Sequence, residues 1–173
     1  MKLLLIQAIG IAGTVLFFLS DPCRQTNNLF RVQFVSYMCY TTHLLLLGAV
    51  TGGVSYLVNT VRSFCLGSRY DFLKGKAMCA ILCILQLAAL ALTWNNWWSI
   101  LPVAANIAAT LGGYTYNARK IRVAGMFINS PLWIVYDILV GSWAGILDEI
   151  VTEASMLLSI YRYGWKNLDT VEE

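Results

Sequence analysis

Charged side chains are scarce in this sequence, and their scarcity excludes most classes of soluble protein. Only 12% of the 173 residues are Asp, Glu, Lys or Arg, whereas 58% are hydrophobic. A soluble domain of this length needs a charged surface around its core, and too few charges are present to supply one. The composition therefore predicts a polytopic membrane protein whose surrounding partner is the lipid bilayer.

The sequence also lacks the motifs of several functional classes. No basic stripe interleaved with aromatic residues accompanies the net charge of +3, so we expect no nucleic-acid partner. G-x-S-x-G and H-E-x-x-H are absent, and the Gly-x-Gly-Asp of intramembrane aspartyl proteases is replaced by "GILDE". Asp137 and Asp148 are expected in solvated positions near the outer interface. We therefore predict that the protein is not an enzyme.

Metal ligands are sparse as well. Cys79 and Cys83 stand one helical turn apart, but no further ligand-forming residues lie near them in the sequence. Small apolar packing explains this pair better than a zinc site does. We expect neither a metal nor another cofactor.

Seven apolar runs are long enough to cross a membrane. A hydrocarbon core roughly 30 Å thick requires about 17 to 25 helical residues. No small-x-small cleavage site follows the first run, so we expect a retained helix and not a signal peptide. The polar end of the chain, residues 164–173, predicts a short cytoplasmic tail. The predicted spans are 3–20, 30–47, 52–68, 77–94, 97–116, 121–140 and 144–163.

The positions of the basic residues predict the orientation of these spans. With seven crossings, every one of the 12 Lys and Arg residues except Lys2 lies in or nearest to segments on one side. Positively charged loops stay on the cytoplasmic side of the membrane. We therefore predict an outer amino terminus and an inner carboxyl terminus.

An internal repeat appears when the sequence is shifted along itself by 93 positions. "HLLLLGAVTGGVSYLVNTVRS" then aligns with "YDILVGSWAGILDEIVTEASM", which places Gly48 on Gly141 and Gly52 on Gly145. The first and fifth runs align at an offset of 96. This register predicts an all-α protein with a 3+1+3 arrangement of two parallel three-helix bundles. The predicted units are a first repeat at 1–70, a linker helix at 77–94 and a second repeat at 97–163.

Three segments carry a resemblance to a known family. "RVQFVSYMCYTTHLLLLGAVTGGVSYLVNTVRSF", "SILPVAANIAATL" and "SPLWIVYDILVGSWAGILDEIVTEASMLLSIYRY" resemble the YgjV family of bacterial inner membrane proteins. The 3+1+3 plan and the W-x-x-Y of "WIVYDILVG" are more distantly similar to the SWEET and PQ-loop (MtN3-like) transporter superfamily. The resemblance implies a multi-pass protein of the bacterial inner (cytoplasmic) membrane with a SWEET-like fold.

The repeat also groups polar residues into equivalent sets on single helix faces. Such sets predict a polar axis through an apolar bundle, which is what a solute path requires. Hydrogen bonding between helices is the structural alternative for each of them. The residues predicted to line the path are Tyr40, His43, Asn59, Trp133, Tyr136, Thr152 and Asn106.

Arg62 is a charged residue near the middle of the third predicted span. Placing a charge there costs roughly 2.5 to 3.5 kcal/mol, so it needs a partner. The repeat register brings Glu149 and Glu153 close to its depth, and we predict a buried ion pair with one or both. This group could clamp the two halves, bind an anionic or zwitterionic solute, or relay protons.

Pro131 lies about half-way along the sixth predicted span and is the candidate hinge, because proline removes a backbone hydrogen bond from a helix. Together these features predict a transporter that moves a small polar solute by alternating access. The alternative is a non-transporting assembly or regulatory partner in the inner membrane, with structural polar residues. The substrate, the coupling ion and the existence of a homo-oligomer stay open.

Overall fold

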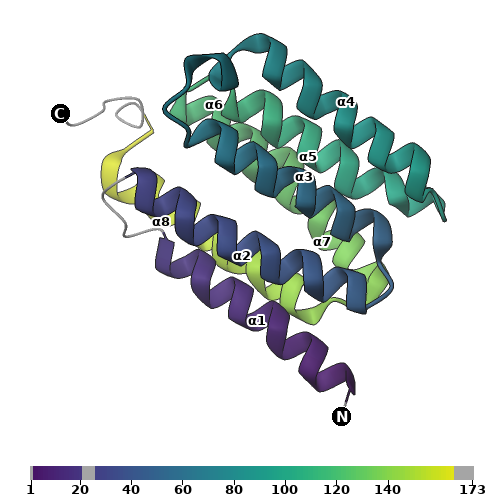
Figure 1. The fold of residues 1–173 in the computed structure, drawn as a ribbon. Coiled ribbons are helices and arrows are strands. Elements are labelled where there is room, and N and C mark those ends of the chain that lie inside the picture. The colour runs from purple at the N-terminus through teal and green to yellow at the C-terminus, as the bar shows by residue number, and fades with distance from the viewer. Residues whose placement is uncertain (1, 21–25, 166–173) are drawn as a thin grey trace.

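The computed structural model describes residues 2–20 and 26–165, and every regular element in these ranges is helical (Figure 1). Residues 166–173 of the predicted tail lie outside the described ranges. The elements are α1 (Lys2–Ser20), α2 (Thr26–Leu46), α3 (Val50–Leu66), η1 (Asp71–Lys74), α4 (Lys76–Thr93), η2 (Trp97–Ser99), α5 (Ile100–Gly113), α6 (Ala118–Ala124), η3 (Gly125–Asn129), α7 (Ser130–Val140) and α8 (Trp143–Tyr163).

Three of these elements are parts of one helix. α6, η3 and α7 follow one another without a break, and η3 is a π-helical turn. Pro131 stands just after this turn, at the start of α7. Counted in this way, the described residues form seven long helices, one for each apolar run of the sequence.

Six of the long helices form a closed ring of neighbours. α1 packs against α2, α2 against α3, α3 against α5, α5 against the α6–α7 helix, α7 against α8, and α8 against α1. α4 packs on α3 and α5 from outside the ring, and Figure 1 shows α1 and α4 at opposite edges of the bundle. The second helix of each predicted repeat therefore lies between the first and the third.

The turns that end α2 and α7 have the same backbone structure. Gly48 and Gly141 adopt left-handed φ angles of 79° and 72°, which glycine enters without the steric cost of a Cβ atom. In the first turn the amide of Ala49 donates to the carbonyl of Leu44 at 2.9 Å. In the second, Ser142 donates to Asp137 at 2.8 Å. Each of these residues is related to its counterpart by the predicted shift of 93 positions.

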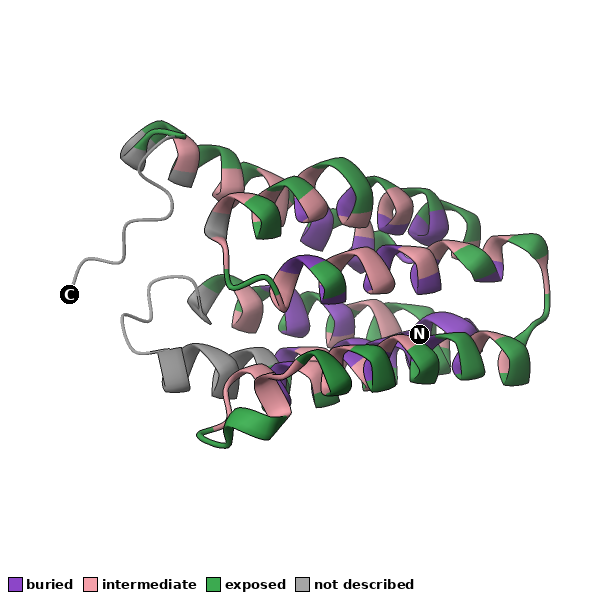
Figure 2. Cartoon of the chain, turned by 90° about the horizontal axis from the view of Figure 1, so that it is seen from above, coloured by how far each residue is buried: buried purple, intermediate pink, exposed green. Residues whose placement is uncertain are grey.

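Apolar side chains cover the outside of the bundle. Figure 2 shows buried residues on the helix faces that point toward one another and exposed residues on the outward faces. Two helices, Lys76–Thr93 and Arg119–Val140, are long and apolar enough to cross a membrane, and Lys2–Phe18 is a shorter apolar stretch. Large exposed apolar side chains include Leu4, Phe64, Ile84, Leu92, Phe127 and Ile138.

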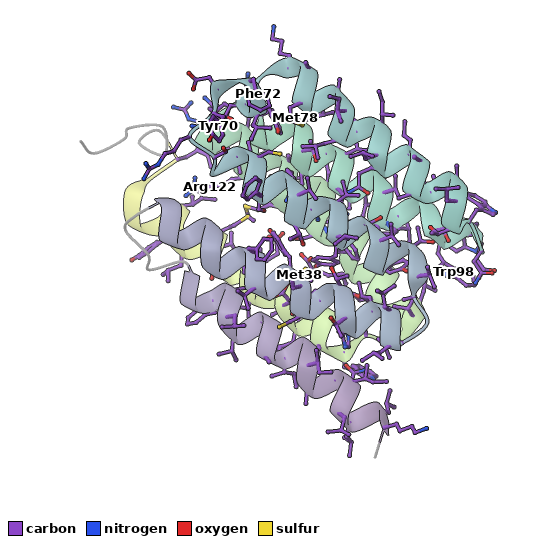
Figure 3. All side chains as sticks on the ribbon, viewed as in Figure 1. Met38, Tyr70, Phe72, Met78, Trp98 and Arg122 are labelled. Atoms are coloured by element: carbon purple, nitrogen blue, oxygen red, sulfur yellow. The ribbon has the colours of Figure 1, made fainter. Side chains whose placement is uncertain are left out.

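The two ends of the bundle differ in charge. The turn end carries the start of α1, the turns after α2 and α7, and the loop between α4 and α5. The basic end carries the loops between α3 and α4 and between α5 and α6. Figure 3 shows Trp98 at the turn end and Tyr70 and Arg122 at the basic end. The described basic residues in and beside the basic-end loops are Arg69, Lys74, Lys76, Arg119, Lys120 and Arg122.

Candidate functional site

Aromatic rings from three helices meet inside the ring of helices. Tyr40 of α2 stacks on Tyr56 of α3 with ring centroids 5.2 Å apart, and Tyr56 contacts Trp133 of α7 at 4.6 Å. Trp133 in turn contacts Tyr136 edge to face at 5.6 Å. All four side chains are buried. We call these four residues the aromatic column; it joins the first predicted repeat to the second.

The prediction of path residues included Tyr40, Trp133 and Tyr136 and missed Tyr56. A signal for Tyr56 was present in the repeat, because the shift of 93 positions places it on Glu149, another residue that the structure buries. Tyr56 precedes Asn59 by three residues, so both lie on the same side of α3. The missed residue occupies the centre of the column.

A pair of buried amides lies beside the column. Asn59 donates from Nδ2 to Oδ1 of Asn106 at 2.7 Å, and Trp133 donates from Nε1 to the same oxygen at 3.2 Å. Oδ1 of Asn59 and Nδ2 of Asn106 have no hydrogen-bond partner among the described residues. Leaving a buried polar group without a partner costs about 1 to 3 kcal/mol. The predicted axis thus holds one acceptor and one donor that a polar ligand would satisfy.

His43 connects α2 to the start of α8 at the turn end. Its Nδ1 lies 2.8 Å from the carbonyl oxygen of Ile6, and its Nε2 lies 2.9 Å from Oγ of Ser142. A carbonyl can only accept, so in the neutral ring Nδ1–H donates to Ile6 and Nε2 accepts from the Ser142 hydroxyl. Oγ of Ser142 also accepts from the amide of Gly145 at 3.1 Å and so caps α8.

Tyr136 makes the corresponding contact in the opposite direction. Its hydroxyl oxygen accepts from the amide of Gly52 at 3.0 Å. Gly52 is the third residue of α3, so its amide has no partner within the helix. The residue before α3 is Ala49, which has no side-chain oxygen to cap it. Each predicted repeat therefore reaches across to the first turn of the other repeat's third helix.

Two glycines make these close contacts sterically feasible. A Cβ atom on Gly52 would lie 2.6 Å from a ring carbon of Tyr136. One on Gly10 would lie 2.5 Å from Cβ of Ala144 and 3.0 Å from Nδ1 of His43. Real Cβ contacts are longer, so a larger side chain at either position would push the helices apart.

A groove of about 540 Å³ opens at the turn end. It lies between the α2–α3 turn, the α4–α5 loop and the end of α7. Tyr136 lines this groove and also belongs to the aromatic column, so the groove reaches the column at this ring. The lining includes Ala49, Thr51, Thr93, Trp94, Trp98 and Tyr136.

The prediction that Asp137 and Asp148 are solvated is wrong. They are only 2% and 6% exposed. Asp137 packs against Gly145 of α8 and Asp148 lies beside Tyr40 of α2. In addition, α1 covers the turn between α7 and α8. Gln7 of α1 donates to the carbonyl of Gly141 at 3.0 Å and accepts from the amide of Ala144 at 3.1 Å. Sequence position within a span cannot reveal this cover, because it comes from a helix more than 130 residues away.

Arg62 and Glu149 both lie near Tyr37 of α2. The Arg62 guanidinium lies beside the ring hydroxyl of Tyr37, and its buried Nη1 has no hydrogen-bond partner. Glu149 is buried beside Ser130 and Asp148. The ion pair of Arg62 with Glu149 or Glu153 stays a prediction.

The repeat register favours Glu153 over Glu149 as the closer residue in depth to Arg62. The repeat register places Arg62 level with residue 155, six residues from Glu149, which is about 9 Å along the axis of α8. Thr152, another predicted path residue, is only partly buried and stands one turn beyond Asp148. The structure therefore assigns the centre of the site to the column and the amides, with Glu149 nearby.

Pro131, the predicted hinge, sits where the α6–α7 helix is irregular. It directly follows the π turn, and the side-chain Nδ2 of Asn129 in that turn donates to the carbonyl of Ala105 in α5 at 2.9 Å. π turns and proline are both recognised causes of helix bending. Movement at this position stays a prediction.

Comparison with known proteins identifies the chain at family level. The family model Imp-YgjV, described as a bacterial inner membrane protein, matches residues 4–167. No curated protein and no solved structure matches the chain. Because the family model spans nearly the whole sequence, the chain belongs to the Imp-YgjV family of bacterial inner membrane proteins.

Proposed function

We propose that this protein is a multi-pass transporter that moves a small polar solute across the inner membrane by alternating access. The moving parts are the two three-helix repeats, 1–70 and 97–163, with α4 as their linker. The turn end faces outside and the basic end faces the cytoplasm. The observation that carries the proposal is the pair of unpartnered groups, Oδ1 of Asn59 and Nδ2 of Asn106, buried between the repeats beside the aromatic column.

The ring of helices supports this division. If α1, α2 and α3 correspond to α5, α6–α7 and α8, the contact between α3 and α5 corresponds to that between α8 and α1. The two repeats thus meet through two equivalent helix contacts on either side of the polar axis. Rocking about these contacts would open one end of the axis while closing the other.

Two hydrogen bonds at the turn end form the proposed gate. His43 with Ser142 and Tyr136 with Gly52 tie the second helix of each repeat to the third helix of the other. Breaking both would separate the repeats at this end and connect the groove with Asn59 and Asn106. The conformation described here is therefore the one closed to the outside.

Accessibility to a water-soluble thiol reagent tests this proposal. Asn59→Cys and Asn106→Cys are introduced separately into a folded variant whose five native cysteines are replaced by serine or alanine. Leu82→Cys is the matched control, because Leu82 is fully buried in α4 outside the polar axis. A transporter labels at 59 and 106 from at least one side of the membrane while position 82 stays unlabelled.

If the cysteines at positions 59, 106 and 82 all remained unlabelled, the result would contradict transport. The buried polar groups would then be structural, as in the alternative of a non-transporting assembly or regulatory protein. Asn95→Cys in the groove lining provides a positive control for reagent access at the turn end.

A further inference from the structure

We propose that the groove at the turn end is the outer binding site for the solute, and that this solute is uncharged and carries a hydroxyl or carboxamide group. This inference rests on the proposed function and names the class of substrate. It comes from a groove lined without charged side chains, which reaches the aromatic column beside two amides with one unpartnered acceptor and one unpartnered donor.

The lining of the groove is the first part of the argument. Its volume of about 540 Å³ accommodates a small organic solute. None of the described residues that line it is Asp, Glu, Lys, Arg or His. The acidic residues Asp137 and Glu149 and the basic residue Arg62 lie outside this lining. A charged solute that left water here would find no counter-charge, so the groove favours an uncharged one.

The groove contains uncharged donors and acceptors instead. Thr51 of α3 donates to the carbonyl of Thr93 at the end of α4 at 2.8 Å, and its hydroxyl lies 3.3 Å from that of Ser99. These hydrogen bonds connect the helix ends that form one wall. Trp98 and the exposed Asn95 add an indole and an amide to the lining. Ligand sites commonly combine such apolar surfaces with a few placed polar groups.

The buried amides are the second part, and one donor fixes their orientations. The indole Nε1–H of Trp133 can only donate, so the atom of Asn106 that lies 3.2 Å from it is the oxygen. Asn59 approaches the same oxygen at 2.7 Å and must present its NH₂ group to it. Oδ1 of Asn59, an acceptor, and Nδ2 of Asn106, a donor, are left without a partner among the described residues.

These two groups favour the same class of solute as the groove. An ammonium group has only donors and a carboxylate has only acceptors, so neither satisfies both amides. A hydroxyl or a carboxamide both donates and accepts. Tyr136 connects the two locations, because it lines the groove and contacts Trp133 at 5.6 Å. An uncharged solute with such a group therefore fits the groove and the buried amides alike.

Four compounds with the same number of non-hydrogen atoms test charge and hydrogen bonding separately. Lactamide is uncharged and carries a hydroxyl and a carboxamide. Lactate is its anionic counterpart, and alaninamide is the cationic counterpart at a pH where its amino group is charged. 1,2-Dimethoxyethane is uncharged but cannot donate a hydrogen bond. Each compound is added to the purified full-length protein at constant ionic strength and pH.

Protection of a cysteine in the groove from a water-soluble thiol reagent reports binding. Val50→Cys is a small change at a lining position that is 47% exposed. Trp143→Cys is the matched control, because Trp143 begins α8 as Val50 begins α3 but lies outside the lining. Both are introduced into the variant without native cysteines.

Lactamide should slow labelling at position 50 and leave position 143 unchanged. Half occupancy of the groove slows the reaction about twofold, because only the unoccupied protein is labelled. Lactate, alaninamide and 1,2-dimethoxyethane at the same concentration should change neither rate.

A charge placed in the groove should change its selectivity. Asn95→Asp adds one negative charge to the lining with little change of shape. Alaninamide should then bind roughly tenfold more tightly, because its ammonium group gains a charged partner, and should slow labelling at position 50. Asn117→Asp is the matched control at the N-cap of α6, where Asp caps as well as Asn. An unchanged response in Asn95→Asp would place binding outside the groove and overturn the inference.

The remaining outcomes separate this inference from the proposed function. If lactate, alaninamide or 1,2-dimethoxyethane protects position 50 as well as lactamide does, or if position 143 is protected equally, the inference is overturned. No protection by lactamide while positions 59 and 106 still label also overturns it and leaves transport standing. Protection by lactamide with positions 59 and 106 unlabelled supports recognition in the groove and overturns transport. No protection together with unlabelled 59 and 106 overturns both.

Discussion

The α2–α3 turn and the α7–α8 turn have the same backbone but different side-chain chemistry. In both, a left-handed glycine ends one helix, and the amide of the next helix's third residue is capped by a hydroxyl. Ser142 caps α8 from within its own repeat, whereas Tyr136 caps α3 from the other repeat. An internal repeat can thus preserve a hydrogen bond while changing the residue that provides it, and the change converts a local cap into a contact between halves.

The third helices of the two repeats also differ in the charge of their equivalent residues. α3 carries Tyr56 and Arg62 where α8 carries Glu149 and Ser155. Acidic groups gather on one repeat and the base on the other, so the pseudo-symmetric axis is electrostatically one-sided.

The largest expected effect is steric and tests whether the two turns are equivalent. Gly52→Ala and Gly145→Ala would place Cβ atoms 2.6 Å from the Tyr136 ring and 2.4 Å from Cγ of Asp137. Each should lower the stability by about 1 to 3 kcal/mol through overpacking, measured by thermal or denaturant unfolding in detergent. Gly75→Ala is the control, since its nearest contact would be 3.5 Å away. An effect at only one turn would break the equivalence.

A smaller effect is expected from exchanging one capping arrangement for the other. Tyr136→Phe removes the acceptor for Gly52 and should cost about 0.5 to 2 kcal/mol, the usual value of a helix cap. Ala49→Ser gives α3 a cap of its own, like Ser142 in α8, and should reduce that cost. A double-mutant cycle measures the coupling. If the two changes were strictly additive, Tyr136 would not act as the cap of α3.

Loss of the Tyr136–Gly52 or the His43–Ser142 hydrogen bond should open the turn end. Tyr136→Phe and His43→Ala should each increase the rate at which a cysteine at position 106 is labelled from the turn end. Thr42→Ala is the control, because its hydroxyl bonds only within α2 at the exposed surface. Unchanged rates in both gate variants would show that these bonds do not hold the gate closed.

The smallest effects are expected at the left-handed glycines. Gly48→Ala and Gly141→Ala should each cost about 1 kcal/mol, because an L-residue with a Cβ atom is strained there. Asn tolerates this conformation better, so Gly48→Asn and Gly141→Asn should cost less. Matched values at the two sites, from the same unfolding measurement, would sharpen the comparison, and a large difference would weaken it.

Local features of the sequence predicted the long helices and the register of the repeat. Apolar runs of sufficient length form helices in a membrane because the backbone must satisfy its own hydrogen bonds there. Gly48 and Gly141 predicted the turns because few other residues accept their φ angles. Spacing on single helix faces and the repeat register predicted that Tyr40, His43, Trp133, Tyr136, Asn59 and Asn106 face the interior, and all six are buried.

Tertiary structure decided the rest, because burial and pairing depend on helices distant in sequence. Gln7 of α1 bonds to the α7–α8 turn, and Gly145 of α8 packs against the carboxyl group of Asp137. Periodicity specifies which face of a helix is polar and says nothing of which helix lies opposite. The amino-acid sequence alone thus determined the helices, the turns and the polar faces, whereas only their packing decided which polar groups meet and which remain without a partner.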